Sequence, residues 1–110
     1  MLTVLGRVRP AHPKQDWIDL SHARLGAADL SAAYLPRAKM YGTILAEANL
    51  IEADLSDSVM PFSDLSSAYL TNAKLARATF NLADLTGATG LPPTARLKKI
   101  VRWDVRTKWP

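Results

Sequence analysis

A period of five residues dominates this 110-residue chain. In blocks of five from Ile18, the third residue is Leu, Met or Phe in fourteen consecutive blocks, from Leu20 to Leu85, and the pattern stops at Gly90. The first residue is Ala in eleven of the fifteen blocks and, after Ile18, is otherwise small. No insertion interrupts the register, so one structural unit repeats through two thirds of the chain.

Neither an ordinary α-helix nor a flat strand can bury such a repeat on one side. On a helix, five residues advance roughly 140° beyond a full turn, so the large residues would spread around the whole surface. On a flat strand, five is an odd number, so successive large residues would alternate between the two faces. The pattern therefore predicts a chain that turns a corner about every five residues, with the third residue of each block inside.

Residues that favour turns occupy the two positions where such corners are expected. Pro36 and Pro61 are both fourth residues of their blocks, and Gly42 and Gly87 are both fifth residues. Proline presets φ for the first central residue of a β-turn, and glycine permits positive φ at the next residue. The fourth and fifth residues of each block are therefore predicted to form the corners.

Centre residues other than leucine recur at a spacing of twenty residues, or four blocks, which predicts four sides per coil. The centre residues other than Leu, before the pattern stops, are Met40, Met60 and Phe80. All three fall in one twenty-residue column above Leu20. Stacked strands lie about 4.8 Å apart, so residues in one column are expected to be neighbours.

Charged side chains follow the same twenty-residue spacing. Opposite charges fall over one another at Asp19 and Lys39, at Asp54 and Lys74, and along Arg37, Asp57 and Arg77. One like-charge step, from Asp64 to Asp84, runs against this trend. An exposed ion pair contributes only about 0–1 kcal/mol, so these pairs identify the register and do not explain stability.

The blocks ADLSA, ANLIE, ADLSD and ADLTG resemble those of the pentapeptide-repeat family, whose consensus is A-(D/N)-L-x-x. The resemblance covers about residues 18–90 and implies an all-β fold, a right-handed quadrilateral β-helix (β-solenoid) of about four coils. The second residue of a block points outward in this family, so departures from Asp or Asn there change the surface and not the fold. The predicted inward core consists of Leu20, Leu25, Leu30, Leu35, Met40, Leu45, Leu50, Leu55, Met60, Leu65, Leu70, Leu75, Phe80 and Leu85.

Both ends of a solenoid expose open backbone edges and need caps. Residues 1–17 are the expected N-terminal cap. Four apolar side chains in this segment are available to cover the first coil: Leu2, Val4, Leu5 and Trp17.

Residues 91–110 are the expected C-terminal cap, built from a short helix and a strand. Thr94 is placed to cap a helix that ends at Ile100. A strict alternation follows, as in a half-buried strand, with four apolar residues on one face: Val101, Trp103, Val105 and Trp109. This face is expected to cover the last coil of its own chain or to form a homodimer contact through the C-terminal end, and the two roles can coexist.

The residue inventory argues against catalysis. The chain has no Cys, which excludes disulfides, thiolate metal sites and a cysteine nucleophile. Its two histidines, His12 and His22, lie near the first cap, and no phosphate-binding loop or nucleophile–base pair can be assembled. We predict no enzymatic activity, no catalytic residue, no cofactor and no metal site. No apolar stretch is long enough for a membrane span or a secretory signal, which predicts a cytoplasmic protein.

Charge is distributed unevenly along a chain whose net charge is +4. Residues 18–90 hold five basic and eight acidic residues, whereas residues 91–110 hold six basic residues and one acidic residue. The basic tail consists of Arg96, Lys98, Lys99, Arg102, Arg106 and Lys108. The candidate binding surface on the repeats consists of Tyr34, Arg37, Asp54, Asp57, Lys74 and Arg77.

Three functions from different classes fit these features. The preferred one is a rigid, non-catalytic module whose outward residues bind another protein. The second is DNA mimicry, which the resemblance implies because some relatives bind DNA gyrase and confer quinolone resistance. Duplex DNA would present roughly ten negative charges over a body of about 18 Å, whereas the repeats have a net charge of −3. The third is binding of nucleic acid or an anionic surface through the basic tail, in which Trp103 and Trp109 are interleaved. For the tail, a solvated face of the cap is the preferred interpretation.

Overall fold

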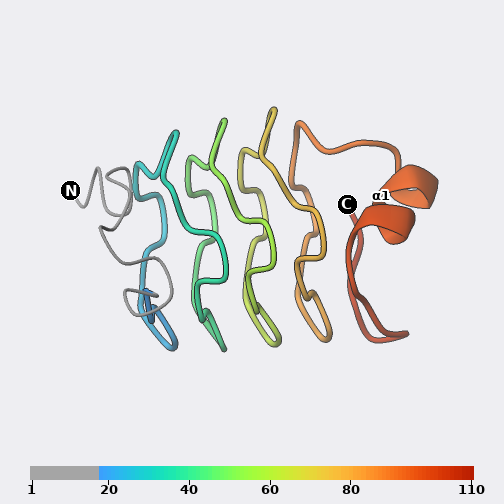
Figure 1. Ribbon diagram of the computed structural model, residues 1–110, viewed down its shortest axis with the longest axis horizontal. Coiled ribbons are helices and arrows are strands. Elements are labelled where there is room, and N and C mark those ends of the chain that lie inside the picture. The colour runs from blue at the N-terminus through green and yellow to red at the C-terminus, as the bar shows by residue number, and fades with distance from the viewer. Residues whose placement is uncertain (1–17) are drawn as a thin grey trace.

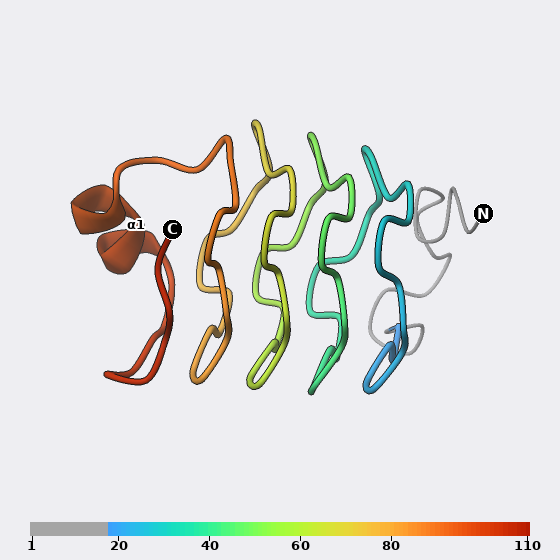
Figure 2. The same ribbon diagram turned by 180° about the vertical axis from the view of Figure 1, so that it is seen from behind.

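The computed structural model describes residues 18–110. Within them the chain winds into a stack of similar coils along the long axis of the body, with helix α1 and the C-terminus at one end (Figure 1). The view from behind shows the same regular stack (Figure 2). Residues 1–17 lie outside the described residues, and so does the N-terminal cap that the sequence predicts there.

The coils stack with the twenty-residue register that the sequence predicts. Within residues 19–89, the backbone bridges are parallel and join residues twenty apart, with four bridged positions in every twenty residues. Each bridged position is the second, outward residue of a block, and the columns define four sides of the body. Side 1 carries Asp19, Lys39, Val59 and Thr79; side 2 carries Arg24, Ile44, Asp64 and Asp84; side 3 carries Asp29, Asn49, Tyr69 and Thr89; side 4 carries Tyr34, Asp54 and Lys74.

Each block is hydrogen-bonded to the coils before and after it. The Asn49 N–H donates to the Ala28 carbonyl of the preceding coil at 2.9 Å, and the Leu50 N–H donates to the Tyr69 carbonyl of the following coil at 2.8 Å. The same pattern recurs along the repeats. Backbone groups that a single short segment cannot satisfy are therefore satisfied by stacking.

The corners are β-turns at the predicted positions. The N–H of the first residue of each block bonds to the carbonyl of the preceding centre residue, as from Ala53 to Leu50 at 3.0 Å. The fifth residue has positive φ in each of the fourteen blocks up to Gly87, and twelve of these residues are not glycine. Positive φ at the second central residue is the mark of a type II turn, whose first central residue favours proline. Pro36 and Pro61 occupy that position.

The interior is filled by the centre residues and the small first residues. Of the fourteen predicted core side chains, those from Leu25 to Leu85 are buried, most of them to an exposed fraction of 0–1%, and Leu20 in the first coil is half-buried. Alanine at the first position lies beside them, and seven of these alanines are fully buried. The inside is therefore a continuous, mostly apolar column in which small first residues pack beside the large centre residues.

Three buried hydroxyl groups replace alanine in this column and are bonded to backbone. Thr43 Oγ1 donates to the Leu20 carbonyl at 2.8 Å. Ser58 Oγ donates to the Leu55 carbonyl, and Ser63 Oγ to the Met60 carbonyl, each at 2.7 Å. Because their hydrogen bonds are made, these hydroxyl groups are structural.

The chain leaves the repeats at Gly90 and enters α1 (Thr94–Ile100). Gly90 has φ +81°, and a Cβ there would overlap the backbone of Thr71, so only glycine fits. The helix ends at the predicted Ile100 but begins at Thr94, which therefore does not cap it. Pro93 is the N-cap residue, without a side-chain hydrogen bond, and its carbonyl accepts from the N–H groups of the first helical turn.

The predicted half-buried strand in residues 101–109 is wrong. Arg102 pairs with Thr79 on side 1 and Lys108 pairs with Asp84 on side 2, and a turn closed by the Thr107 N–H and the Asp104 carbonyl lies between them. The turn ends the alternation, and Val105 at its tip is 94% exposed.

The tail instead follows sides 1 and 2 as an irregular continuation of the repeats. Two segments of the tail resemble the first three residues of a repeat block. A β-branched residue comes first, an outward residue second and a large residue third, in Val101–Arg102–Trp103 and in Thr107–Lys108–Trp109. The bridged partners are 23 and 24 residues apart because α1 and a longer corner add residues. Thr107 Oγ1 donates to the Phe80 carbonyl at 2.8 Å, as Thr43 does to Leu20 three coils earlier.

In the part of the chain that the structure describes, no helix is long and apolar enough to cross a membrane.

Candidate functional site: the charged fourth side and the basic end

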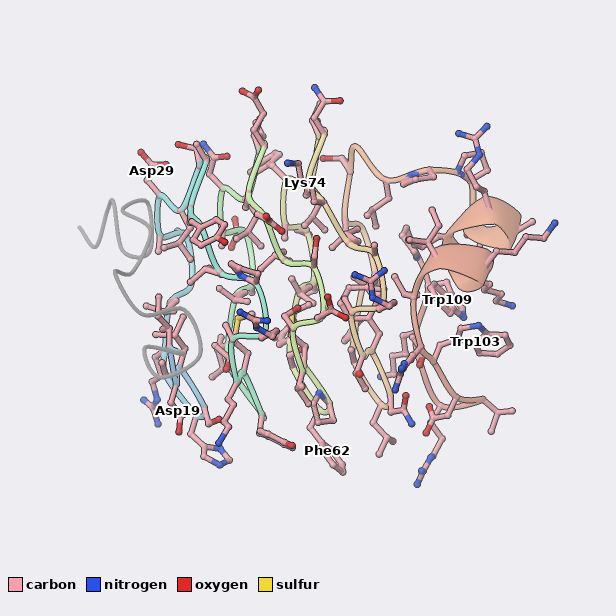
Figure 3. All side chains as sticks on the ribbon, in the orientation of Figure 1. Asp19, Asp29, Phe62, Lys74, Trp103 and Trp109 are labelled. Carbon is pink, nitrogen blue, oxygen red and sulfur yellow. The ribbon has the colours of Figure 1, made fainter. Side chains whose placement is uncertain are left out.

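Side 4 brings three residues of the predicted binding surface into one column. Parallel bridges join Tyr34 to Asp54 and Asp54 to Lys74. Asp54 therefore lies about 4.8 Å, one strand spacing, from each of the other two backbones. Lys74 is exposed and lies near the middle of the stack of coils (Figure 3).

The other three residues of that surface lie at the corner between sides 4 and 1. Arg37, Asp57 and Arg77 are fifth residues of successive coils with φ of 61°, 59° and 61°. Arg77 binds Asp57 through two hydrogen bonds, Nε to Oδ1 at 2.7 Å and Nη2 to Oδ2 at 2.8 Å. This is the planar bidentate geometry that guanidinium and carboxylate groups favour.

The corner is an electrostatic junction between the repeats and the basic tail. Hydrogen bonds from Arg77 lower the pKa of the Asp57 carboxyl, and the charges of Arg77, Arg37 and Arg102 lower it further. Asp57 in turn raises the pKa of Arg77. Arg102 belongs to the tail, so two surfaces that the sequence suggests separately meet here. The Arg77 and Asp57 side chains are 61% and 39% exposed, so the pair contributes little to stability and is open to a partner.

The tryptophans of the tail are occupied by the chain's own lysine. Trp103 and Trp109 pack edge to face with ring centroids 5.8 Å apart, and the Lys98 ammonium lies 4.6 Å and 5.4 Å from the two centroids. The Trp103 indole N–H donates to the Lys98 carbonyl at 3.0 Å. Figure 3 shows both rings together beside α1. This cation–π cluster fixes the tail to the helix.

Two further cations of the tail lie beside carboxylates. Arg106 pairs with Asp104 at 3.0 Å. Hydrogen bonds from Thr86 lower the pKa of Asp84, and the positive charge of Lys108 lowers it further. Arg96, Lys99 and Arg102 complete the basic tail, and all three are exposed.

The four apolar residues predicted as a cap or dimer contact are separated by the structure. Val101 is buried, and Trp109 is half-buried and packed against the core. Trp103 is 39% exposed and Val105 is 94% exposed. They do not share one face.

Acidic residues gather on sides 2 and 3 and their corners. These sides hold five acidic residues and one basic residue of the repeats: Asp29, Glu47, Glu52, Asp64 and Asp84, with Arg24.

Exposed apolar residues form a feature that the sequence reasoning missed. The exposed large apolar residues of the repeats are Phe62 at 65%, Tyr69 at 49%, Tyr41 at 44% and Ile44 at 39%. A signal for them existed, because each is a large apolar residue at a second, fourth or fifth position of its block, where the predicted fold points outward.

The structure assembles no metal cluster from its described residues. Within residues 18–110, no group of three or more His, Asp or Glu residues lies close enough to hold a metal ion. His22 is exposed at a corner, and its charge contributes weakly to lowering the pKa of Asp19, after the hydrogen bonds of Ser21 and the charge of Lys39. His12 lies outside the described residues.

A coil with a filled interior and a variable outer surface defines a repeat protein of the solenoid class. The family model described as "Pentapeptide repeats (8 copies)" matches residues 18–60 and 63–89. The chain belongs to the pentapeptide-repeat family, and its fold is a right-handed β-helix.

Several solved structures are similar to this chain. A pentapeptide repeat protein from the thylakoid lumen of Arabidopsis thaliana is 28% identical with a TM-score of 0.66, over 68% of this chain and 52% of that chain. Rfr23 from the cyanobacterium Cyanothece 51142 is 28% identical with a TM-score of 0.39, over 84% and 64%. A trypsin-treated form of QnrB1, a plasmid-mediated fluoroquinolone resistance protein, is 16% identical with a TM-score of 0.45, over 92% and 57%.

The chain therefore spans between 52% and 64% of the length of these solved chains. None of the curated protein sequences is detectably similar.

Proposed function

We propose that this chain is a non-catalytic interaction module, a rigid prism that presents its sides to another protein. The observation that carries the proposal is the filled interior, in which the centre side chains are 0–7% exposed from Leu25 to Leu85. Among the described residues, no buried side-chain nitrogen or oxygen lacks a hydrogen-bond partner. Specific chemistry is thus left to the outer surface.

Side 4 and its corner are the binding surface we favour. Both charge signs occur there on a rigid backbone, in the column of Tyr34, Asp54 and Lys74 and along the corner of Arg37, Asp57 and Arg77. Fixed, alternating charges select a partner by complementarity and orientation more than by hydrophobic area. The partner expected is a protein with a mixed-charge surface. A cytoplasmic location stays a prediction.

The domain limits and the caps are part of this proposal. Residues 18–90 form a β-helix of about four coils, and residues 91–110 close its end. The tail supplies partners to the last coil, because Arg77, Phe80 and Leu85 donate to the carbonyls of Ile100, Arg102 and Lys108 at 2.7–2.8 Å. The Asp104 carboxylate accepts from the Leu82 N–H at 3.1 Å. Such bonds remove the open edge that a solenoid must cover.

The two alternatives have specific features for and against them. The acidic character of sides 2 and 3 is the feature that favours DNA mimicry. Against it, these carboxylates do not form a continuous row like the phosphates of DNA, because Asp64 and Asp84 are the one directly stacked pair of carboxylates among the described columns. Binding of nucleic acid by the tail is disfavoured, because Lys98 covers both tryptophans and Arg106 is paired with Asp104. Bases would need free aromatic faces for stacking.

An affinity capture with two matched variants tests the proposal. The double variant K74E/R77E changes side 4, and R24E/K108E makes the same change in charge on side 2. We expect wild type and R24E/K108E to retain one protein from an extract of the native host, and K74E/R77E to lose it. Equal capture by both variants would count against side 4.

Two assays on the purified protein separate the alternatives. We expect no inhibition of supercoiling by DNA gyrase and no steep salt dependence of retention on heparin. Potent gyrase inhibition would support DNA mimicry, and strong retention that disappears without residues 91–110 would support binding through the tail.

A further inference from the structure

An exposed apolar strip runs beside side 1 at its corner with side 2. Phe62 is 65% exposed and Tyr41 is 44% exposed at this corner, and Val59 lies half-buried on side 1 itself. Figure 3 shows Phe62 projecting from the edge of the body, on the same edge as Asp19. A fixed aromatic side chain that projects into solvent is typical of the anchor of a protein interface.

The charges on side 1 have opposite signs at its two ends. The column begins with Asp19, passes Lys39, Val59 and Thr79, and is continued by Arg102, which pairs with Thr79. Asp19, Lys39 and Arg102 are all exposed. Val59 is the middle of these five positions. Side 1 therefore has an apolar centre between an acidic and a basic end, which is the layout of an interface core with a polar rim.

This layout is complementary to itself when a second copy is turned end for end. A two-fold axis through Val59, lying in the plane of side 1 and across the column, places Asp19 of one copy against Arg102 of the other, and the reverse. The same operation brings Phe62 of each copy to the same level and sets Lys39 against the neutral Thr79. A two-fold contact uses one surface patch twice, so its charges must satisfy this condition.

The other three sides fail the same test. On side 2 the column with its continuation has Arg24 and Lys108 at its ends, so like charges would meet. On side 4 the central residue is Asp54, which would meet its own copy. On side 3 the described column has no opposite charges to pair. With the axis at the centre of the column, complementarity is thus confined, within residues 18–110, to side 1.

We propose that side 1 is an interface between two antiparallel copies of this chain. It is distinct from a contact through the C-terminal end, because the body lies side by side with its partner. The dimensions of 36 × 28 × 24 Å allow a side of at most about 1,000 Å² in outline, a little more than the roughly 800 Å² per partner of a standard interface. Since the contact uses only part of the side, the dimer is weak and reversible.

The corner next to side 4 is compatible with this arrangement. Under the same axis, Arg37 of one copy faces the Arg77 corner of the other, and Asp57 lies level with its own copy between these arginines. Arg77 is already held by Asp57 through its bidentate ion pair, so the two guanidinium groups do not meet as free charges.

Sedimentation across a wide concentration range tests the interface with one substitution at its centre. V59D places a carboxylate against its own copy, and Asp is the residue at the second position of five other blocks, so the coil tolerates it. We expect the dimer to be lost while the circular dichroism spectrum and melting stay close to those of wild type. For the substitution D19K, which reverses a charge at one end of side 1, D64K on side 2 is the matched control, because Asp64 and Asp19 both accept a backbone hydrogen bond from the serine two residues later.

Charge reversal gives a second, independent test. D19K and R102D each place like charges together twice, so each alone should raise the dissociation constant at least about tenfold. An equimolar mixture of D19K and R102D restores both opposite pairs, so we expect a heterodimer where neither variant dimerises alone. A wild-type chain that is monomeric at every concentration, or a dimer that V59D leaves intact and V105D abolishes, would overturn the proposal.

Discussion

Replacing one buried hydroxyl in the tail tests whether the tail is built into the coil. Thr107 is 6% exposed, and its Oγ1 donates to the Phe80 carbonyl at 2.8 Å and accepts from the Asp104 N–H at 3.2 Å. Valine keeps the shape but cannot make these bonds. A lost hydrogen bond costs about 1 kcal/mol. The Phe80 carbonyl still accepts from the Ala83 N–H at 2.9 Å, so the group that loses its partner is the Asp104 N–H; an unsatisfied donor costs about 1–3 kcal/mol where it is buried.

We therefore expect T107V to lower the free energy of unfolding by about 1–2 kcal/mol. For a domain of this size the melting temperature should fall by roughly 5–15 °C. T43V is the internal reference, because Thr43 makes the equivalent bond to Leu20 inside the repeats. T89V is the negative control, because Thr89 is exposed.

Urea unfolding followed by circular dichroism, with all three variants compared at one pH, gives the required free energies. The expected order is T43V and T107V both destabilised, and T89V unchanged. If T43V loses stability while T107V behaves like T89V, the tail is not packed in the register described here.

Three further changes have defined outcomes. L50A removes a fully buried centre side chain and should cost about 2–5 kcal/mol in urea unfolding, whereas a cost below about 1 kcal/mol would contradict an inward position. G90A places a Cβ against the Thr71 backbone at φ +81°; differential scanning calorimetry should show a clear loss of stability, and an unchanged transition would refute the close approach. Hydrogen bonds lower the pKa values of Asp84 and Asp104 below the ordinary range, in Asp104 against the opposing effect of partial desolvation. A carboxyl group whose pKa is lower in the folded state than in the unfolded state stabilises the fold at pH values above the unfolded pKa of about 4. This contribution is lost as the pH falls through the folded pKa. The free energy of unfolding, measured from pH 7 to pH 2, should fall with pH, and the fall should be smaller in D104N. A free energy of unfolding that does not depend on pH would contradict this prediction.

The repeats were predictable because one period decides both their local and their long-range structure. A five-residue period forces corners, and the shared column of Met40, Met60 and Phe80 gives their spacing. The corners could be placed from Pro36 and Pro61, since proline fits only the first central position of the turn that forms there. The ion pair of Asp57 with Arg77 follows from the same register.

The tail was not predictable from its pattern, for a physical reason. Its alternation from Val101 to Val105 is the ordinary signal of a strand, and only the backbone partners on the last coil show that a turn replaces it. The lengths of α1 and of the longer corner shift the register by amounts that no sequence period reports. Thr94 has the side chain of a helix cap, yet the extended Pro93 takes that position, one residue earlier.

The surface was predictable only in part. The charge columns follow from the repeat, but the meeting of Arg102 with the Asp57 corner depends on the path of the tail. The exposure of Tyr41 and Phe62 follows from their block positions, although their significance depends on which side they border.

Disulfide formation between engineered cysteines tests the stacking of the coil most directly. The chain has no native Cys, and the outward residues Asn49 and Tyr69 form a parallel bridge, which puts their backbones about 4.8 Å apart, within disulfide range. Oxidation of N49C/Y69C, read by mass spectrometry of the folded monomer, should go rapidly to completion, whereas N49C/D64C and N49C/K74C should stay reduced. Closure of a pair 15 or 25 residues apart, with the pair 20 apart left open, would contradict the four-sided coil.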